Sequence, residues 1–139
     1  MRKIPGLLGA LTLAGVMACG GGGGGDGGVT NPPPPPPPTC ANNTFCMGAT
    51  SFFTSAGTNV NTLTVAPNTP VTFTNDSGIL HDVTFDDPST ALAVGNGAAG
   101  DIPVHTSGSH QRQFAVSGTS HPFHCTQHGL VMHGTVNVQ

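Results

Sequence analysis

The stretch PFHCTQHGLVM, residues 122–132, brings a thiol, an imidazole and a thioether together as Cys125, His128 and Met132. At its start Phe123 and Cys125 alternate with His124. Side chains two residues apart share one face of a β-strand, so an inward Phe123 also turns Cys125 inward and His124 outward. The stretch therefore predicts a strand that delivers a thiol to the core, followed by a loop that adds further soft ligands suited to copper.

A second stretch, residues 81–85 (HDVTF), supplies another imidazole. By the same alternation His81 shares a face with Val83 and Phe85, so we expect its ring to point into the core. A mononuclear electron-transfer copper centre uses one thiolate, two imidazoles and a weak axial thioether. The predicted ligand set is therefore His81, Cys125, His128 and Met132.

The same alternation, with apolar residues two positions apart, extends through residues 40–139. This length is sufficient for one small hydrophobic core. Apolar residues pair at i and i+2 in Leu63/Val65, Val71/Phe73, Val83/Phe85, Phe114/Val116 and Val136/Val138. Turn-forming sequences separate these pairs at residues 67–70, 75–78, 107–109 and 117–119. The pattern predicts an all-β domain, an antiparallel sandwich or small barrel, and only residues 87–99 are irregular enough to contain a helical turn.

The N-terminal part of the chain has a different composition. Residues 1–18 start with Arg2 and Lys3 and continue with a short apolar run, which indicates an export signal. The run ends in VMAC, residues 16–19, which resembles the lipobox of bacterial lipoproteins and implies a lipidated Cys19. Cleavage after Ala18 by an ordinary signal peptidase would instead leave Cys19 unmodified. Residues 19–39, rich in Gly and Pro, are expected to form a linker that tethers the domain.

Composition excludes several classes of protein. The chain has 3 Lys+Arg and 6 Asp+Glu, so it lacks the basic surface that nucleic-acid binding needs. No apolar stretch approaches the roughly 20 residues of a membrane-spanning helix, so membrane attachment is expected only through the lipid anchor. The expected location is the periplasm or cell envelope, and the expected state is a monomer.

The two ligand stretches together resemble those of the cupredoxins, type 1 blue copper proteins, and are most similar to the plastocyanin and pseudoazurin type. Residues 78–86 and 123–136 carry the resemblance, including the Met-x-Gly ending at 132–134, and it covers about the whole domain, from roughly Cys46 to Val138. It implies a Greek-key antiparallel β-sandwich of seven or eight strands over 40–139. It also implies one copper ion whose ligands fall on His81, Cys125, His128 and the axial Met132.

Two positions depart from that family's pattern. The ligand loop reads Cys-x2-His-x3-Met, whereas plastocyanin-like loops more often have four residues between the histidine and the methionine and amicyanin-like loops have two. The spacing to Met132 therefore falls between those of the two loop types. The residue after the first histidine is usually an asparagine that ties the ligand segments together, and here it is Asp82, whose side chain strand parity directs outward.

The remaining cysteines and histidines have other expected roles. Cys40 and Cys46 are predicted to form a disulfide in an exported protein, with a second metal site at Cys46 and Met47 as the alternative. Zinc could compete for the main site, but no second thiolate lies near it in the sequence. Most of the other five histidines are expected on the surface, where they could also bind copper weakly: His105, His110, His121, His124 and His133.

These features predict a non-enzymatic protein that carries single electrons between redox partners. Its partners are expected to dock around the second imidazole ligand, on apolar residues at the same end of the sandwich: His128, Leu130, Val131, Ile79 and Leu80. The alternative is a periplasmic copper-binding or copper-delivery protein that uses the same ligands.

Overall fold

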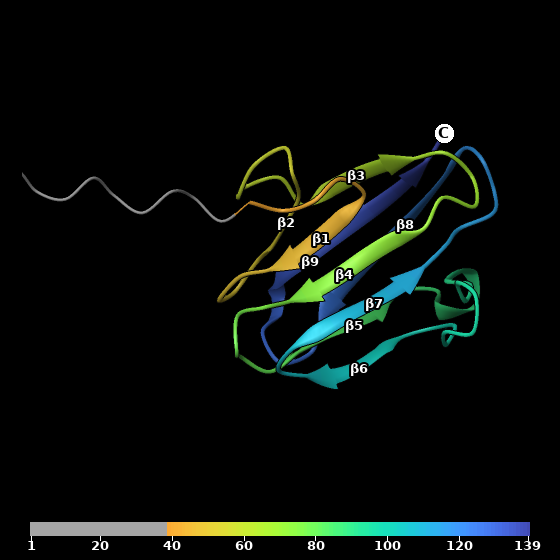
Figure 1. Ribbon diagram of the computed structural model, residues 1–139. Helices are drawn as coiled ribbons and strands as arrows, with labels where there is room; N and C mark the ends of the chain where they lie inside the picture. The colour runs from red at the N-terminus through yellow and green to blue at the C-terminus, as the bar shows by residue number, and fades with distance from the viewer. Residues whose placement is uncertain (1–38) are drawn as a thin grey trace, which may run out of the picture. The chain divides into compact units, whose positions relative to one another are not determined.

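A computed structural model describes residues 39–139 as a two-layered β-structure (Figure 1). The predicted export signal (1–18), the lipidation site Cys19 and the linker up to residue 38 lie outside the described residues. Within residues 39–139 no helix is long and apolar enough to cross a membrane.

Nine strands and one short 3-10 helix make up the described part of the chain. In chain order they are β1 (Thr44–Met47), β2 (Phe52–Phe53), β3 (Thr62–Val65), β4 (Val71–Asn75), β5 (His81–Phe85), η1 (Pro88–Thr90), β6 (Ile102–His105), β7 (Gly108–Arg112), β8 (Thr119–Cys125) and β9 (Gly129–Val138). The helical turn falls inside the irregular segment 87–99, where Asp87 caps it by accepting a hydrogen bond from the backbone N–H of Ser89.

The strands form two sheets that face one another. One has the order β2-β1-β4-β7 and the other the order β3-β9-β8-β5-β6 (Figure 1). The predicted all-β sandwich is confirmed, but the sheets are mixed, because β1 pairs with β4 and β3 pairs with β9 in parallel. Alternation of apolar and polar residues is the same in parallel and antiparallel pairing, so the sequence pattern did not distinguish them.

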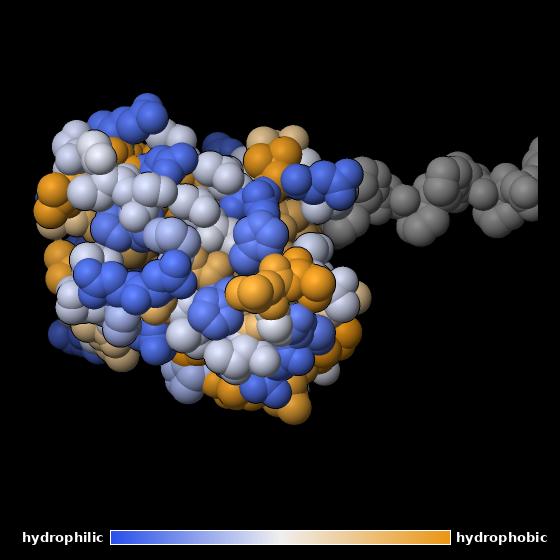
Figure 2. Space-filling model, turned by 180° about the vertical axis from the view of Figure 1, so that it is seen from behind, coloured by the Kyte–Doolittle hydropathy of each residue, from blue (hydrophilic) through white to orange (hydrophobic). Residues whose placement is uncertain are grey.

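Apolar alternation separates the inside of the sandwich from its outside. In β4, and in β9 from Met132 onward, the residues with the parity of Val71 and Val136 are buried, and the residues between them are partly or fully exposed. The face seen from behind in Figure 2, where the five-stranded sheet lies nearest, is mostly polar, with separate apolar groups among the polar ones. Both sheets therefore contribute one face to a common core.

Phenylalanine rings fill that core. The ring of Phe123 packs edge-on against Phe45 and Phe52, each with ring centroids 4.9 Å away, and against Phe73 at 5.3 Å. Phe123 pairs with Gly134 on β9, and a Cβ atom added at Gly134 would lie 2.4 Å from Phe123 Cζ. A glycine is therefore required where the Phe123 ring lies against the neighbouring strand.

One predicted strand is not present. Phe114 is fully buried, but Val116 is 62% exposed, and both follow the end of β7. The neighbouring Arg112 is instead an unexpected core residue, 2% exposed. Its guanidinium donates to the backbone carbonyls of Gly100, Gln111 and Asp101 at 2.6–2.8 Å. These bonds hold the loop before β6 against the end of β7 and satisfy the buried guanidinium.

Candidate metal centre

Strand ends position the candidate ligands. His81 is the first residue of β5 and Cys125 the last residue of β8. These two strands are antiparallel, so the start of one and the end of the other lie at the same end of the sandwich. His128 follows in the short turn between β8 and β9, where its backbone N–H donates to the Cys125 carbonyl at 3.3 Å. The turn therefore returns an imidazole toward the thiol that precedes it.

Three side chains meet at this end. Nδ1 of His81 lies 3.7 Å from Sγ of Cys125, and Nδ1 of His128 lies 3.5 Å from the same sulfur. The two imidazole rings have their centroids 4.7 Å apart. All three ligand atoms lie within 4.8 Å of one another. His81 and Cys125 are completely buried and His128 is half-buried, so the group is nearly closed to solvent.

The distances are those of a metal-binding group. Protein imidazole nitrogens and thiolates bind zinc at about 2.0 and 2.3 Å, which at an angle near 110° separates the two donors by about 3.5 Å. The observed separations from Cys125 to His81 and His128 match this value without further movement. One thiolate and two imidazoles fit one type 1 copper ion. Within residues 39–139 the group contains no second thiolate or carboxylate, which a tetrahedral zinc site would use.

The environment of His81 favours a neutral ring. Burial, followed by the neighbouring His128, lowers the pKa of His81, against a smaller raising effect of a backbone hydrogen bond at Gly48. Nε2 of His81 is buried and has no close hydrogen-bond partner among residues 39–139. A neutral imidazole with Nδ1 facing the sulfur is the form that a metal ion requires.

Asp82 is more buried than its outward parity suggests. It is only 6% exposed. Asp82 Oδ1 accepts a hydrogen bond from the Thr126 backbone N–H at 2.6 Å, and Oδ2 accepts one from the Thr126 hydroxyl. Thr84 pairs with His124 in the antiparallel β5–β8 ladder, and the same register places Asp82 opposite Thr126 on the outward face. Asp82 is therefore buried by its contact with Thr126 and not by a turn of its side chain into the core.

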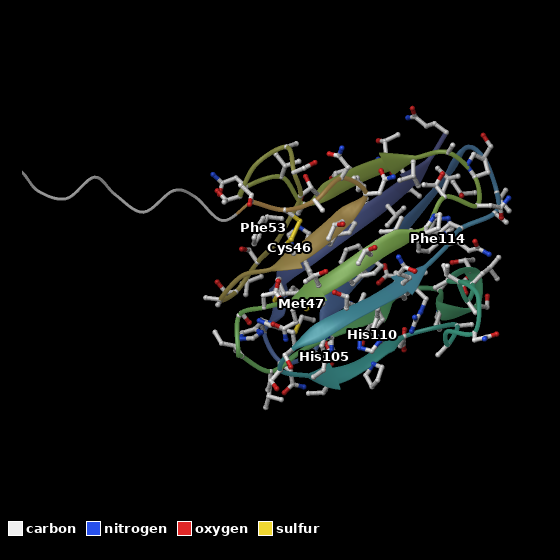
Figure 3. All side chains as sticks on the ribbon, in the orientation of Figure 1. Cys46, Met47, Phe53, His105, His110 and Phe114 are labelled. Atoms are coloured by element: carbon white, nitrogen blue, oxygen red, sulfur yellow. A yellow bond between two sulfur atoms is a disulfide. The ribbon has the colours of Figure 1, made fainter. Side chains whose placement is uncertain are left out.

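Met132 lies in β9 with the inward parity of Val136 and is fully buried. It belongs to the same hydrophobic cluster as Cys125, and its assignment as the axial ligand stays a prediction. Cys40 and Cys46 are joined in a disulfide with a sulfur–sulfur distance of 2.21 Å (Figure 3). Cys46 is therefore engaged with Cys40 and offers no thiolate for a second metal.

Four apolar side chains around the group are exposed. Leu130 and Val131, which follow His128 directly, are 82% and 74% exposed, and Ile79 and Leu80, which precede His81, are 40% and 50% exposed. These residues do not cap the core. We call Ile79, Leu80, Leu130 and Val131 the apolar rim.

Comparison with known proteins supports the fold. No protein-family model and no curated protein matches the chain. Among solved structures it is similar to a reduced amicyanin with a Trp-to-Tyr substitution, with 24% identity and a TM-score of 0.50 over 69% of this chain and 80% of that one. It is also similar to an oxidised amicyanin with a Met-to-Lys substitution, with 22% identity and a TM-score of 0.51 over 70% and 82%.

A third similar structure is the reduced Cu(I) form, at pH 4, of an amicyanin with a Pro-to-Gly substitution. It has 22% identity and a TM-score of 0.51 over 74% of this chain and 87% of that one. The chain therefore has the cupredoxin fold of amicyanin, and the predicted fold class is confirmed.

Proposed function

We propose that this protein is a mononuclear type 1 copper protein that carries single electrons between redox partners. The observation that carries the proposal is the group of His81, Cys125 and His128, whose ligand atoms lie within 4.8 Å of one another in a buried site. Met132 is proposed as the weak axial ligand. Copper held by these side chains would supply one-electron chemistry by alternating between Cu(I) and Cu(II).

The chain's own residues would keep the ligand geometry constant in both oxidation states. Thr126, which follows Cys125, donates two hydrogen bonds to Asp82, which follows His81. These bonds tie the two ligand segments together. The buried core around Cys125 opposes movement of the sulfur. A site that moves little on gaining or losing an electron has a small reorganisation cost, which favours electron transfer.

His128 is proposed as the route by which electrons enter and leave. It is the half-buried ligand, whereas His81 and Cys125 are completely enclosed. The apolar rim beside it offers a small surface on which a redox partner could dock through a weak, transient contact. We propose an electron carrier and no enzymatic activity.

Copper delivery is the competing function. A protein that hands its metal to another needs ligands that an acceptor can reach. The complete burial of His81 and Cys125 favours retention of the metal and therefore electron transfer. Transfer of copper to a high-affinity chelator within seconds would favour delivery, whereas retention over hours would favour electron transfer.

We also propose that the protein is exported and held at the cell envelope by a lipid on Cys19. The proposal rests on the VMAC sequence at residues 16–19 and the Gly/Pro-rich segment that follows. A Cys19→Ala variant should leave the membrane fraction. Unchanged membrane association would contradict the lipid anchor.

The visible spectrum of the purified protein after addition of Cu(II) tests the main proposal. We expect an intense blue thiolate-to-copper band that is absent from Cys125→Ser, with the same far-ultraviolet circular dichroism in both proteins. His133→Gln, which removes an exposed imidazole, serves as the control and should remain blue. A Cys125→Ser variant that stays blue would overturn the assignment.

A further inference from the structure

A second pair of histidines lies outside the metal centre. His105 is the last residue of β6 and His110 lies within β7, so the pair joins the two sheets across a short connection. Their ring centroids are 4.8 Å apart and the rings are inclined by 72°. Figure 3 labels both residues, which lie close together on these neighbouring strands. Both are half-buried, contrary to the expectation of surface positions.

The hydrogen bonds of His105 determine which ring nitrogen carries its proton. Nδ1 lies 2.8 Å from the backbone carbonyl of Pro103. A carbonyl oxygen only accepts hydrogen bonds, so Nδ1 must be the donor. In the neutral ring Nε2 is then an unprotonated lone pair. That nitrogen is inaccessible to solvent and has no hydrogen-bond partner among residues 39–139.

A buried lone pair without a partner is costly unless something occupies it. Histidines that bind metals have this arrangement, with one nitrogen donating to a backbone carbonyl and the other nitrogen free for the ion. The Pro103 carbonyl therefore orients His105 as a metal ligand through Nε2. The nearest ring to it that can supply a second nitrogen is that of His110.

His110 is suited to the same task. Burial, followed by His105 and then Arg112, lowers the pKa of His110, so its ring offers a lone pair rather than a positive charge at pH 7. Neither of its ring nitrogens makes a hydrogen bond within the described part of the chain, which leaves the ring free to turn toward its neighbour. The group of His81, Cys125 and His128 includes neither residue, so the pair is a separate feature.

We propose that His105 and His110 form a second metal site, which binds one divalent transition-metal ion through two imidazole nitrogens with water completing its coordination. Imidazole is a ligand for both Zn(II) and Cu(II), and the absence of a thiolate at this pair distinguishes it from the centre at Cys125. Because β6 pairs with β5 with His105 opposite His81, one ligand of the second site lies beside a ligand of the first.

Zinc titration of the copper-loaded full chain by isothermal calorimetry tests this inference. The blue band is recorded throughout to show that the first site keeps its copper. We expect the native chain to bind one further equivalent of Zn(II) and His110→Gln to lose that equivalent while its blue band is unchanged. His105→Gln should also lose it. His133→Gln is the matched control, because His133 is exposed and bonds the Leu130 carbonyl through Nδ1.

Imidazole resonances in the NMR spectrum identify the ligands directly. Those of His105 and His110 should shift with zinc, and those of His124 and His133 should not. The inference is overturned if the native chain binds no further zinc, if both variants bind it as tightly as the native chain, or if only His133→Gln loses it. Absence of the blue band would bear only on the first site. The zinc binding of the native chain and of His110→Gln can be compared whichever metal the first site holds.

Discussion

Both carboxylate oxygens of Asp82 accept hydrogen bonds from Thr126, one from its backbone N–H at 2.6 Å and one from its hydroxyl. The two residues are the immediate neighbours of His81 and Cys125, so a buried negative charge lies beside the metal centre and holds its two ligand segments together.

The Asp82→Asn substitution is predicted to raise the reduction potential of the copper protein. A nearby negative charge stabilises Cu(II) more than Cu(I), and its removal favours reduction by on the order of 50 mV, roughly 1 kcal/mol for a one-electron couple. Asparagine still accepts the Thr126 backbone bond. Voltammetry measures the change, and Asp76→Asn, which removes an exposed charge, is the control. An unchanged or lower potential in Asp82→Asn would contradict the electrostatic role.

Met132→Leu should keep the blue colour and raise the potential. An axial thioether is a weak ligand that donates some electron density to copper, and leucine fills a similar volume in the core without donating. Spectroscopy and voltammetry of the same sample measure both quantities. Loss of all copper binding, or an unchanged potential, would count against Met132 as the axial ligand.

Charge in the apolar rim should slow electron transfer without altering the centre. Leu130→Asp places a carboxylate at a position that is 82% exposed beside His128, which opposes desolvation when a partner docks. We expect the bimolecular rate constant with the physiological partner to fall roughly tenfold, or about 1.4 kcal/mol. Val116→Asp is the matched control. Val116 is also exposed, and it precedes the first residue of β8, at the end of that strand away from Cys125. Equal rates for both variants would place docking elsewhere.

Gly134→Ala should destabilise the fold through a clash in the core. The added Cβ would lie 2.4 Å from Phe123 Cζ, so either the ring or β9 must shift, at a cost of about 1–3 kcal/mol in the free energy of unfolding. Urea denaturation measures it. In a Phe123→Leu background, Gly134→Ala should lower the free energy of unfolding by less than it does in the native chain, because the clashing ring is gone. Strict additivity of the two substitutions would argue against the clash.

His121 should make stability depend on pH. It is 8% exposed, its ring nitrogens bond the hydroxyls of Thr90 and Thr119 at 3.0 and 2.8 Å, and it stacks on Phe114. Burial lowers its pKa below the ordinary 6.5, against a smaller raising effect of Asp87. The unfolded chain therefore takes up the proton first, so the contribution of His121 is complete above about pH 6.5 and is lost as the pH falls toward its folded pKa.

Urea denaturation of the metal-free protein at pH 7.5 and pH 5.5 measures this dependence. His121→Gln should be less stable than the native chain at pH 7.5, and the difference between the two should be smaller at pH 5.5. His124→Gln, at a half-exposed position, is the control. A difference that stays constant between the two pH values would show that His121 does not titrate on unfolding.

Strand parity determined the inner and outer faces of the two ligand stretches. Phe123 and Cys125 point inward with His124 at the surface, and His81 shares the buried face of Val83. Alternation is a local property of an extended backbone, so the sequence alone was sufficient to predict it. The chemistry of the ligands and the all-β class followed from residue types and turn signals in the same way.

Parity did not predict exposure at two positions. Asp82 lies on the outward face but is covered by Thr126, which bonds both of its carboxylate oxygens, and Val116 is exposed because β7 ends at Arg112. The spacing of apolar residues signals neither outcome, because both depend on where distant parts of the chain lie.

Only the tertiary structure decided which residues far apart in sequence meet. Asp82 and Thr126 are separated by 44 positions. Register between strands likewise sets Gly134 opposite Phe123 and pairs β1 with β4 in parallel. The contact of His105 with His110 depends on the path of the chain from one sheet to the other. The alternation of apolar and polar residues indicates which face of a strand a side chain occupies. It does not indicate which strand lies alongside, because packing of the whole core sets the register and the neighbours.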